Sequence, residues 1–218
     1  MLIWAYTLPG RHERKEKAGE APTPPHFAPQ HTIRARFVKR LCNIPATILG
    51  TSPTSDMPFL VGILTISDKG ARGEREDTSG AAIREMLSSL EAAVERYEVV
   101  ADERASITQR LIAWADEAGL DLIVTTGGTG LGPRDVTPEA TRDAIDYEAP
   151  GLVEAMRLEG LKHTPMAMLS RAVAGVRGRT LIVNLPGSPS GVSENLSVLL
   201  PVLPHALETL RGQTEHNP

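Results

Sequence analysis

The chain contains almost no cysteine and few aromatic residues. Cys42 is the single cysteine among 218 residues, so no internal disulfide can form, which fits a reducing compartment such as the cytoplasm. Phe, Trp and Tyr make up 4% of the residues, against 41% hydrophobic residues in all. The core must therefore be built chiefly from Leu, Val, Ile, Ala and Met.

Long hydrophobic runs, a strong excess of one charge and clustered metal ligands are also missing. No apolar run approaches about 18 residues, and the first residues do not resemble a secretion signal, so we expect no membrane span and no membrane partner. The net charge of −4, without a basic stripe, argues against general nucleic-acid binding. The histidines and the cysteine show no zinc-type spacing.

Residues 1–56 differ in character from the rest of the chain. They carry eight Lys and Arg against four Asp and Glu, whereas residues 57–218 carry fifteen against twenty-three. A proline-rich stretch, APTPPHFAPQ, disfavours regular structure in this segment. We interpret residues 1–56 as a flexible or partner-binding extension, or as sequence upstream of a true start at Met57. Residues 57–218 are predicted to form one domain.

From residue 57 onward, strand-like and helix-like patterns alternate. Such alternation predicts βαβ units and an α/β fold, a three-layer sandwich around a mostly parallel sheet. Arg177-Gly178 separates two apolar runs and predicts a hairpin, hence one antiparallel strand. Ser106 is expected to open a helix through a capping box with Gln109, and Thr137 to cap the helix that starts at Pro138. We expect strands over 59–66, 95–100, 120–125, 172–176 and 179–185, and helices over 81–90, 106–118, 138–146, 151–162 and 193–210, the last one kinked or split by its prolines.

The most informative segment is TTGGTGLGPRDVTPE, residues 125–139, which follows an apolar run. Four glycines within six positions let backbone N–H groups approach a ligand closely, and successive N–H groups of this kind prefer anions. Arg134 and Asp135 add a cation and a carboxylate, which suits a phosphate with a bound divalent metal. The spacing matches neither the P-loop nor the dinucleotide fingerprint. The segment predicts a nucleotide or phosphate site.

Polar loops follow each predicted parallel strand, and ligands of open α/β sheets bind beyond the carboxyl ends of the strands. For Asp77, the sequence leaves both a functional role and loop stabilisation open. For Arg171, the two alternatives are a phosphate clamp and a surface position. The candidate ligand-binding residues at this edge are Ser67, Asp68, Thr126, Gly127, Gly128, Thr129, Gly130, Arg134, Ser170, Arg171, Asn184, Pro186, Gly187 and Ser188.

Asp102 and Asp135 are the carboxylates we favour as metal ligands. Mg²⁺ prefers hard oxygen donors, commonly one or two carboxylates together with substrate phosphates. Local hydrogen bonding is the alternative for Asp102, and an ion pair with Arg134 or bonds to nearby helix N–H groups for Asp135.

Three segments in order, ILTISDKGARGEREDTSG, TTGGTGLGPRDVTPEAT and NLPGSPSG, together resemble the MogA type of molybdopterin adenylyltransferase. The resemblance spans about residues 60–210. Related molybdotransferases, which insert molybdenum, usually carry a different form of the middle motif, so the adenylyltransferase is the closer match.

The resemblance implies a fold of the molybdopterin-binding-domain type and a defined reaction. The terminal phosphate of molybdopterin would attack the α-phosphate of ATP, with Mg²⁺ required, and pyrophosphate would leave. Asp102 and Asp135 fall on the two aspartates that are important for activity in the family, which makes them the predicted catalytic and metal-binding residues.

The resemblance also implies small-molecule substrates and a homo-oligomer, a trimer or hexamer. Apolar helix faces over 152–161 and 196–207 could form such an interface, although core packing explains them equally well. The molybdenum-insertion enzyme is a candidate partner. Three alternatives stay open: a non-catalytic molybdopterin-binding protein, a molybdenum-insertion enzyme, and an unrelated Mg-dependent nucleotidyltransferase.

Overall fold

A six-stranded sheet with helices on both faces forms the domain. The computed structural model describes residues 57–213, so the predictions for residues 1–56 lie outside the described residues. The elements, in chain order, are β1 (Phe59–Ile66), α1 (Asp68–Ala71), α2 (Thr78–Leu87), β2 (Ala92–Val100), α3 (Arg104–Asp116), β3 (Leu122–Thr126), α4 (Thr137–Ala144), β4 (Tyr147–Glu148), α5 (Pro150–His163), the 3₁₀ helix η1 (Pro165–Leu169), β5 (Ala174–Arg177), β6 (Thr180–Leu185), α6 (Pro189–Leu199) and α7 (Leu203–Arg211).

The strand order is β2-β1-β3-β6-β5-β4. The strands β2, β1, β3 and β6 are parallel, and β5 runs antiparallel to both of its neighbours, β6 and β4. The prediction of a mostly parallel sheet with one antiparallel strand is therefore confirmed. The carboxyl ends of β1, β2, β3 and β6 meet at one edge, and this edge positions the site.

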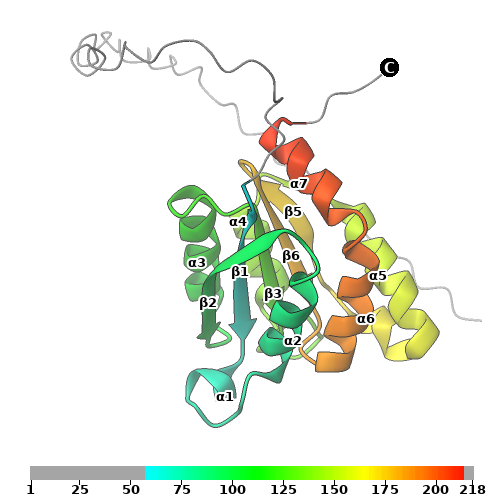
Figure 1. Ribbon diagram of the computed structural model, residues 1–218. Coiled ribbons are helices and arrows are strands. Elements are labelled where there is room, and N and C mark those ends of the chain that lie inside the picture. The colour runs from blue at the N-terminus through cyan, green and yellow to red at the C-terminus, as the bar shows by residue number, and fades with distance from the viewer. Residues whose placement is uncertain (1–56, 214–218) are drawn as a thin grey trace, which may run out of the picture. The chain divides into compact units, whose positions relative to one another are not determined.

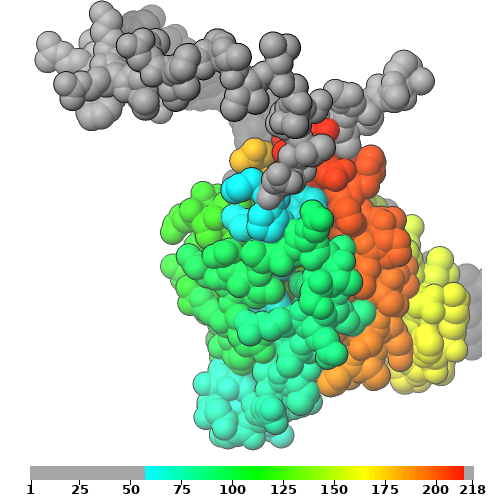
Figure 2. Space-filling model, in the orientation of Figure 1, coloured from blue at the N-terminus to red at the C-terminus, as the bar shows by residue number. Residues whose placement is uncertain are grey.

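The sheet lies between two helical layers, as predicted. Helices α3 and α4 pack against one face through a cluster that includes Ile107, Leu111 and Trp114. Helices α2, α5, α6 and α7 cover the other face around β1, β3 and β6, and Figure 1 shows the two layers on opposite sides of the strands. In the space-filling view, the teal surface of α2 meets the orange surface of α6 directly (Figure 2).

Aliphatic residues fill both sides of the central strands. All residues of β3 and β6 are buried, which explains their near-continuous apolar sequences. No helix within residues 57–213 has the length and hydrophobicity needed to cross a bilayer.

A buried amide joins the sheet to α4. The side-chain oxygen of Asn184 accepts the N–H of Val173 (3.1 Å), and its amide nitrogen donates to the hydroxyls of Thr125 and Thr141 (2.9 Å each). Asn184 is fully buried, and these three bonds use its amide. The predicted ligand-binding role of Asn184 is therefore corrected: its side chain faces the core.

Two predicted helix starts are wrong because other side chains do the capping. Asp77 caps α2 by accepting the N–H of Gly80, so the helix begins at Thr78 and not at residue 81. Ser188 caps α6 in the same way, and this helix begins at Pro189 instead of residue 193. The expected break near the prolines occurs between Leu199 and Leu203, where α6 ends and α7 begins.

Two predicted caps were assigned to the wrong residues. Helix α3 begins at Arg104, before Ser106, and Glu103 precedes it without a side-chain cap bond. Thr137 is the first residue of α4, and its hydroxyl donates to the carbonyl of Gly127 (2.9 Å). The short elements α1, β4 and η1 were not predicted, because each is too short to show a periodic pattern.

Gly62 provides a test of the packing between β1 and α3. A Cβ at this position would lie 2.6 Å from the Trp114 ring and 2.7 Å from Leu120. We expect Gly62→Ala to lower the free energy of unfolding by about 1–3 kcal/mol, measured by chemical denaturation, because the buried ring has to shift. Gly151→Ala in α5 is the control, since its Cβ would meet nothing within 4 Å. Equal stability of the two variants would contradict this packing.

Candidate functional site

Three loops at the carboxyl edge of the sheet meet at Gly127. This residue has φ +98°, and a Cβ on it would lie 2.3 Å from the carbonyl oxygen of Ile66 at the end of β1. A Cβ on Gly187, after β6, would lie 3.2 Å from the Cα of Gly127. The hydroxyl of Thr126 donates to the carbonyl of Pro186 (2.6 Å) and ties the same loops together. The backbones approach so closely that a side chain at Gly127 is excluded.

Asp68 and Asp102 join the loop after β1 to the loop after β2. The N–H of Asp68 donates to the Asp102 carboxylate (2.7 Å), and the N–H of Asp102 donates to the Asp68 carboxylate (3.1 Å). With the contacts at Gly127, these bonds bring the loops of all four parallel strands to one place. The predicted convergence of the loops is confirmed.

The two carboxylates of this pair have different electrostatic surroundings. Arg134 donates to Asp68 at 2.9 and 3.1 Å, and this ion pair lowers the pKa of the Asp68 carboxyl. Burial raises the pKa of Asp102, and the negative charges of Asp68 and Asp135 raise it further. Of the two carboxylates, only Asp68 is bonded to a cationic side chain.

Arg171 supports the glycine loop through hydrogen bonds to its backbone carbonyls. Its guanidinium donates to the carbonyl of Gly130 (2.6 Å), to the carbonyl of Asp135 and to the carboxylate of Glu139. Its backbone N–H donates to the carbonyl of Thr129 (2.9 Å). These contacts engage the guanidinium, so Arg171 braces the loop, a role that differs from both alternatives left open by the sequence, a phosphate clamp and a surface position.

Asp135 shapes the second half of the glycine loop. Its carboxylate accepts the N–H of Gly132 (2.7 Å), and its own N–H donates to the carbonyl of Gly132 (3.0 Å). A Cβ on Gly130 would lie 2.9 Å from the same carboxylate oxygen. Asp135 thus holds the loop closed on itself, and it lines neither of the two hollows described next.

The first hollow, which we name the β1–β2 hollow, has a volume of about 210 Å³. It lies between the end of β1, the start of α2 and the glycine loop, with Asp102 in its wall. Thr126, Gly127 and Gly128 form one side of it and Thr78 and Ser79 another. Its lining residues are Thr65, Ile66, Ser67, Gly70, Arg75, Glu76, Asp77, Thr78, Ser79, Val99, Asp102, Thr126, Gly127, Gly128 and Gly187.

The second hollow, the α5–α6 hollow, is larger, about 430 Å³. Thr129 and Gly130 of the glycine loop border it, so this loop separates the two hollows. Polar and apolar side chains from α5, η1 and α6 are mixed in its wall. The wall also includes three residues from the predicted set, Ser170, Pro186 and Ser188.

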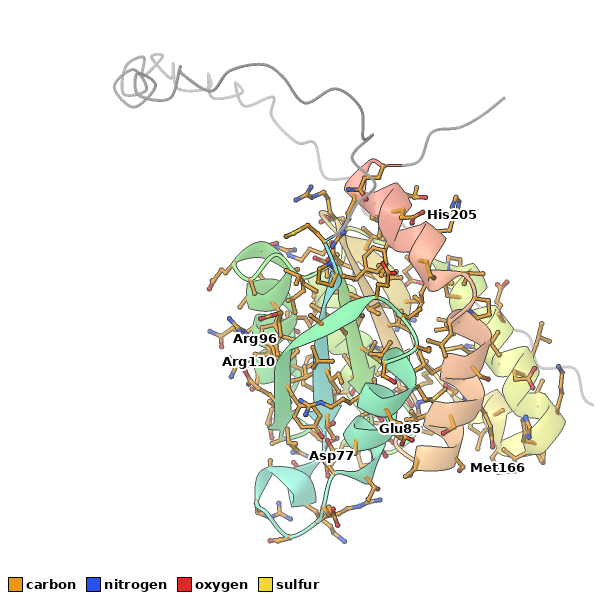
Figure 3. All side chains as sticks on the ribbon, in the orientation of Figure 1. Asp77, Glu85, Arg96, Arg110, Met166 and His205 are labelled. Atoms are coloured by element: carbon orange, nitrogen blue, oxygen red, sulfur yellow. The ribbon has the colours of Figure 1, made fainter. Side chains whose placement is uncertain are left out.

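Asp77 stabilises the entrance of the β1–β2 hollow. Its carboxylate accepts the N–H of Gly80 (2.8 Å) and the hydroxyls of Thr65 (2.6 Å) and Tyr97 (2.5 Å). Burial and this carboxylate raise the pKa of Tyr97 to about 12. Figure 3 shows Asp77 and Met166, which line different hollows, both toward the same end of the molecule.

Several lining residues were not predicted from the sequence. Arg75, Thr78 and Ser79 precede or open α2, and only the adjacent polar run DTSG signalled them. His163, Met166 and Glu194 reach the second hollow from helices, where no motif marks them. A more open depression of about 660 Å³ lies along α3, and none of its residues comes from a strand end.

The donors fit a metal held partly by substrate. Within residues 57–213 there is no group of three or more His, Cys, Asp or Glu that could enclose an ion. Asp102, with its raised pKa and its position in the β1–β2 hollow, is a single carboxylate of the kind that shares Mg²⁺ with phosphates. The metal roles of Asp102 and Asp135 stay predictions; the carboxylate of Asp135 accepts the N–H of Gly132.

The fold is thus a mostly parallel α/β sheet with a glycine loop between two adjoining hollows. The model of the probable molybdopterin binding domain matches residues 62–205. This is more than half of the chain, and the chain belongs to this family.

Similar proteins of known sequence and structure carry matching names. Molybdopterin adenylyltransferase of Helicobacter pylori strain J99 is 46% identical over 154 residues, 70% of this chain and 88% of the relative. The structure of the molybdopterin biosynthesis enzyme MoaB from Thermus thermophilus is 64% identical, with a TM-score of 0.68, over 71% of this chain and 97% of the relative. The resemblance drawn from the three motifs is confirmed, and the family places the chain in molybdenum cofactor biosynthesis.

Arg134 offers a test of the charge arrangement. Because Arg134 lowers the pKa of both Asp68 and Asp102, Arg134→Gln is expected to raise both values, and that of Asp68 more. Carboxyl ¹³C chemical shifts followed against pH measure them. Arg72→Gln is the control for Asp102, since Arg72 is not among the groups that shift its pKa. An unchanged pKa of Asp68 in Arg134→Gln would show that the ion pair does not exist in solution.

The contact at Gly127 can be separated from the effect of its backbone conformation. Gly127 and Gly73 both have positive φ, but a Cβ on Gly73 would meet nothing within 4 Å. Gly73→Ala is expected to cost about 1 kcal/mol of unfolding free energy from conformation alone. Gly127→Ala should cost at least about 2 kcal/mol more, since its Cβ overlaps the Ile66 carbonyl. Equal losses in denaturant titrations would refute the close approach.

Proposed function

We propose that this protein transfers the adenylyl group of ATP to the terminal phosphate of molybdopterin and releases pyrophosphate. The observation that carries the proposal is the pair of hollows that adjoin at the glycine loop and at residues 186–188. Two substrates bound in the two hollows would bring their phosphates together at Gly127–Gly130. Relatives named molybdopterin adenylyltransferase support the choice of reaction.

The β1–β2 hollow suits the triphosphate of ATP. Gly127 and Gly128 have positive φ, and the N–H of Gly127 donates to the carbonyl of Leu185 (3.3 Å). The N–H groups of Gly128, Thr129 and Gly130 make no hydrogen bond among the described residues and can face an anion. The start of α2 borders the same hollow, and a helix N-terminus favours negative charge. Asp102 would hold Mg²⁺ here together with phosphate oxygens, and the ion would neutralise part of the phosphate charge.

The α5–α6 hollow suits the pterin. It is about twice as large as the β1–β2 hollow, and its wall mixes apolar Met166 and Leu169 with polar Glu194 and Asn195. A flat heterocycle rich in amide and amino groups can stack on the former and exchange hydrogen bonds with the latter. Ser170 and Ser188 lie in the same wall, within the part that the glycine loop borders.

In this arrangement, catalysis depends on positioning and charge. An oxygen of the molybdopterin phosphate attacks the α-phosphorus of ATP, the bond from this phosphorus to the bridging oxygen breaks, and pyrophosphate leaves with the electron pair. Arg171 fixes the backbone of the glycine loop through the Gly130 carbonyl and Asp135 fixes it through the Gly132 N–H, so the remaining N–H groups of the loop would stabilise the developing charge without reorganisation. We assign Asp135 a positioning role through Gly130 and Gly132, and Asp102 the direct one.

Three further assignments are part of the proposal. The bifunctional molybdenum cofactor biosynthesis proteins of Chlorobaculum tepidum and Synechococcus elongatus contain a matching region, which supports a molybdenum-insertion enzyme as partner. A homo-oligomer is supported by exposed Leu158 and Leu161 on α5, whereas Leu196 and Leu207 belong to the core. A cytoplasmic location rests on the single cysteine, which lies outside the described residues.

The decisive test compares Asp102→Asn with the unchanged chain. The full chain is incubated with molybdopterin, ATP and Mg²⁺, and adenylylated molybdopterin and pyrophosphate are measured by mass spectrometry. We expect Asp102→Asn to reduce turnover by about 100-fold or more, because an amide retains the bond from the Asp68 N–H but carries no charge for the metal. Its unfolding free energy should stay close to that of the unchanged chain, since burial already favours the neutral form of Asp102.

Asp116→Asn is the matched control. Asp116 pairs with Arg177 on the surface and lines neither hollow, so its turnover should be unchanged. If the unchanged chain binds molybdopterin but forms no adenylylated product, the protein is a molybdopterin-binding protein without this activity. Product formed from adenylylated molybdopterin and molybdate without ATP would identify a molybdenum-insertion enzyme.

A further inference from the structure

The charged side chains that line the β1–β2 hollow are acidic, with one exception. Glu76, Asp77 and Asp102 contribute three carboxylates to its wall, and Arg75 is the only Lys or Arg among its lining residues. A triphosphate in this hollow would face repulsion from the acidic wall. Its binding therefore requires positive charge beyond the backbone N–H groups.

The other arginines near this edge already have partners. Arg72 donates to Glu74 at 2.8 and 2.9 Å, Arg134 pairs with Asp68 and Glu103, and Arg171 braces the glycine loop. Within residues 57–213, Arg75 makes no ion pair and no side-chain hydrogen bond. Its guanidinium is exposed at the wall of the hollow and is available to an anionic ligand.

The direction of the reaction places the leaving group on the side of Arg75. In phosphoryl-type transfer, the attacking and leaving oxygens lie roughly in line on opposite sides of the phosphorus. With the pterin phosphate entering from the α5–α6 hollow, past Thr129 and Gly130, the β- and γ-phosphates point away from that hollow. They extend into the β1–β2 hollow, whose wall includes Arg75.

We propose that Arg75 binds the β- and γ-phosphates of ATP and holds the pyrophosphate as its bond to the α-phosphorus breaks. This assignment rests on the proposed function and adds a residue that determines affinity for the triphosphate. The planar guanidinium can bind two phosphate oxygens at once, which a lysine ammonium cannot do with the same geometry.

Titration calorimetry on the full chain with Mg²⁺ tests this assignment without molybdopterin. We expect Arg75→Ala to weaken binding of both ATP and pyrophosphate by about tenfold, the loss of one charge-assisted contact. AMP, which lacks the β- and γ-phosphates, should bind within about twofold of its original affinity. Arg75→Lys should bind ATP and pyrophosphate with affinities between those of Arg75→Ala and the unchanged chain, since lysine keeps the charge but loses the paired donors.

Arg72→Ala is the control for loss of one positive charge on the same loop. Arg72 is bonded to Glu74 and does not line the hollow, so ATP and pyrophosphate should bind as before. Unchanged pyrophosphate binding in Arg75→Ala, or an equal loss for AMP, would overturn the assignment. An unchanged chain that binds neither ATP nor pyrophosphate overturns it too, whereas ATP binding without adenylyl transfer overturns only the proposed function.

Discussion

The close approach of three backbones at Gly127 is the constraint on which the site depends. The loops after β1, β3 and β6 meet where a Cβ would overlap the Ile66 carbonyl, so the position requires glycine. Thr126 and Thr137 then hold the loop by donating to the carbonyls of Pro186 and Gly127. Within the loop, the N–H of Gly127 donates to the carbonyl of Leu185 and the N–H of Gly132 to the Asp135 carboxylate, so the loop is anchored at both ends.

Charge is distributed unevenly among the aspartates around this backbone. The negative charge of Asp68 is compensated by the ion pair with Arg134, and the Asp135 carboxylate accepts the N–H of Gly132. Asp102 receives only the N–H of Asp68, and its burial favours the neutral form until a cation arrives. The same edge carries Arg75, whose side chain makes no ion pair among the described residues.

Much of the fold was predictable because its signals are local. Continuous apolar runs mark β1, β3 and β6, and the Arg177-Gly178 turn marks the hairpin that makes β5 antiparallel. Helix starts were predicted less well, because capping depends on which polar side chain reaches an N–H group. Asp77 and Ser188 do so, whereas Ser106, which fits the capping-box pattern, lies inside α3.

The sequence by itself determined the glycine loop, the polar ends of the strands and the family, because each depends on residue types at short spacing. Only the tertiary structure decided which of these polar residues line the hollows and which hold the fold together. Asn184 turns inward to bond with Thr125 and Thr141, and Arg171 turns toward the back of the loop. The separation into two hollows depends on α5, η1 and α6 packing beside the glycine loop, and residues so far apart in the chain come together only through the burial of their apolar faces.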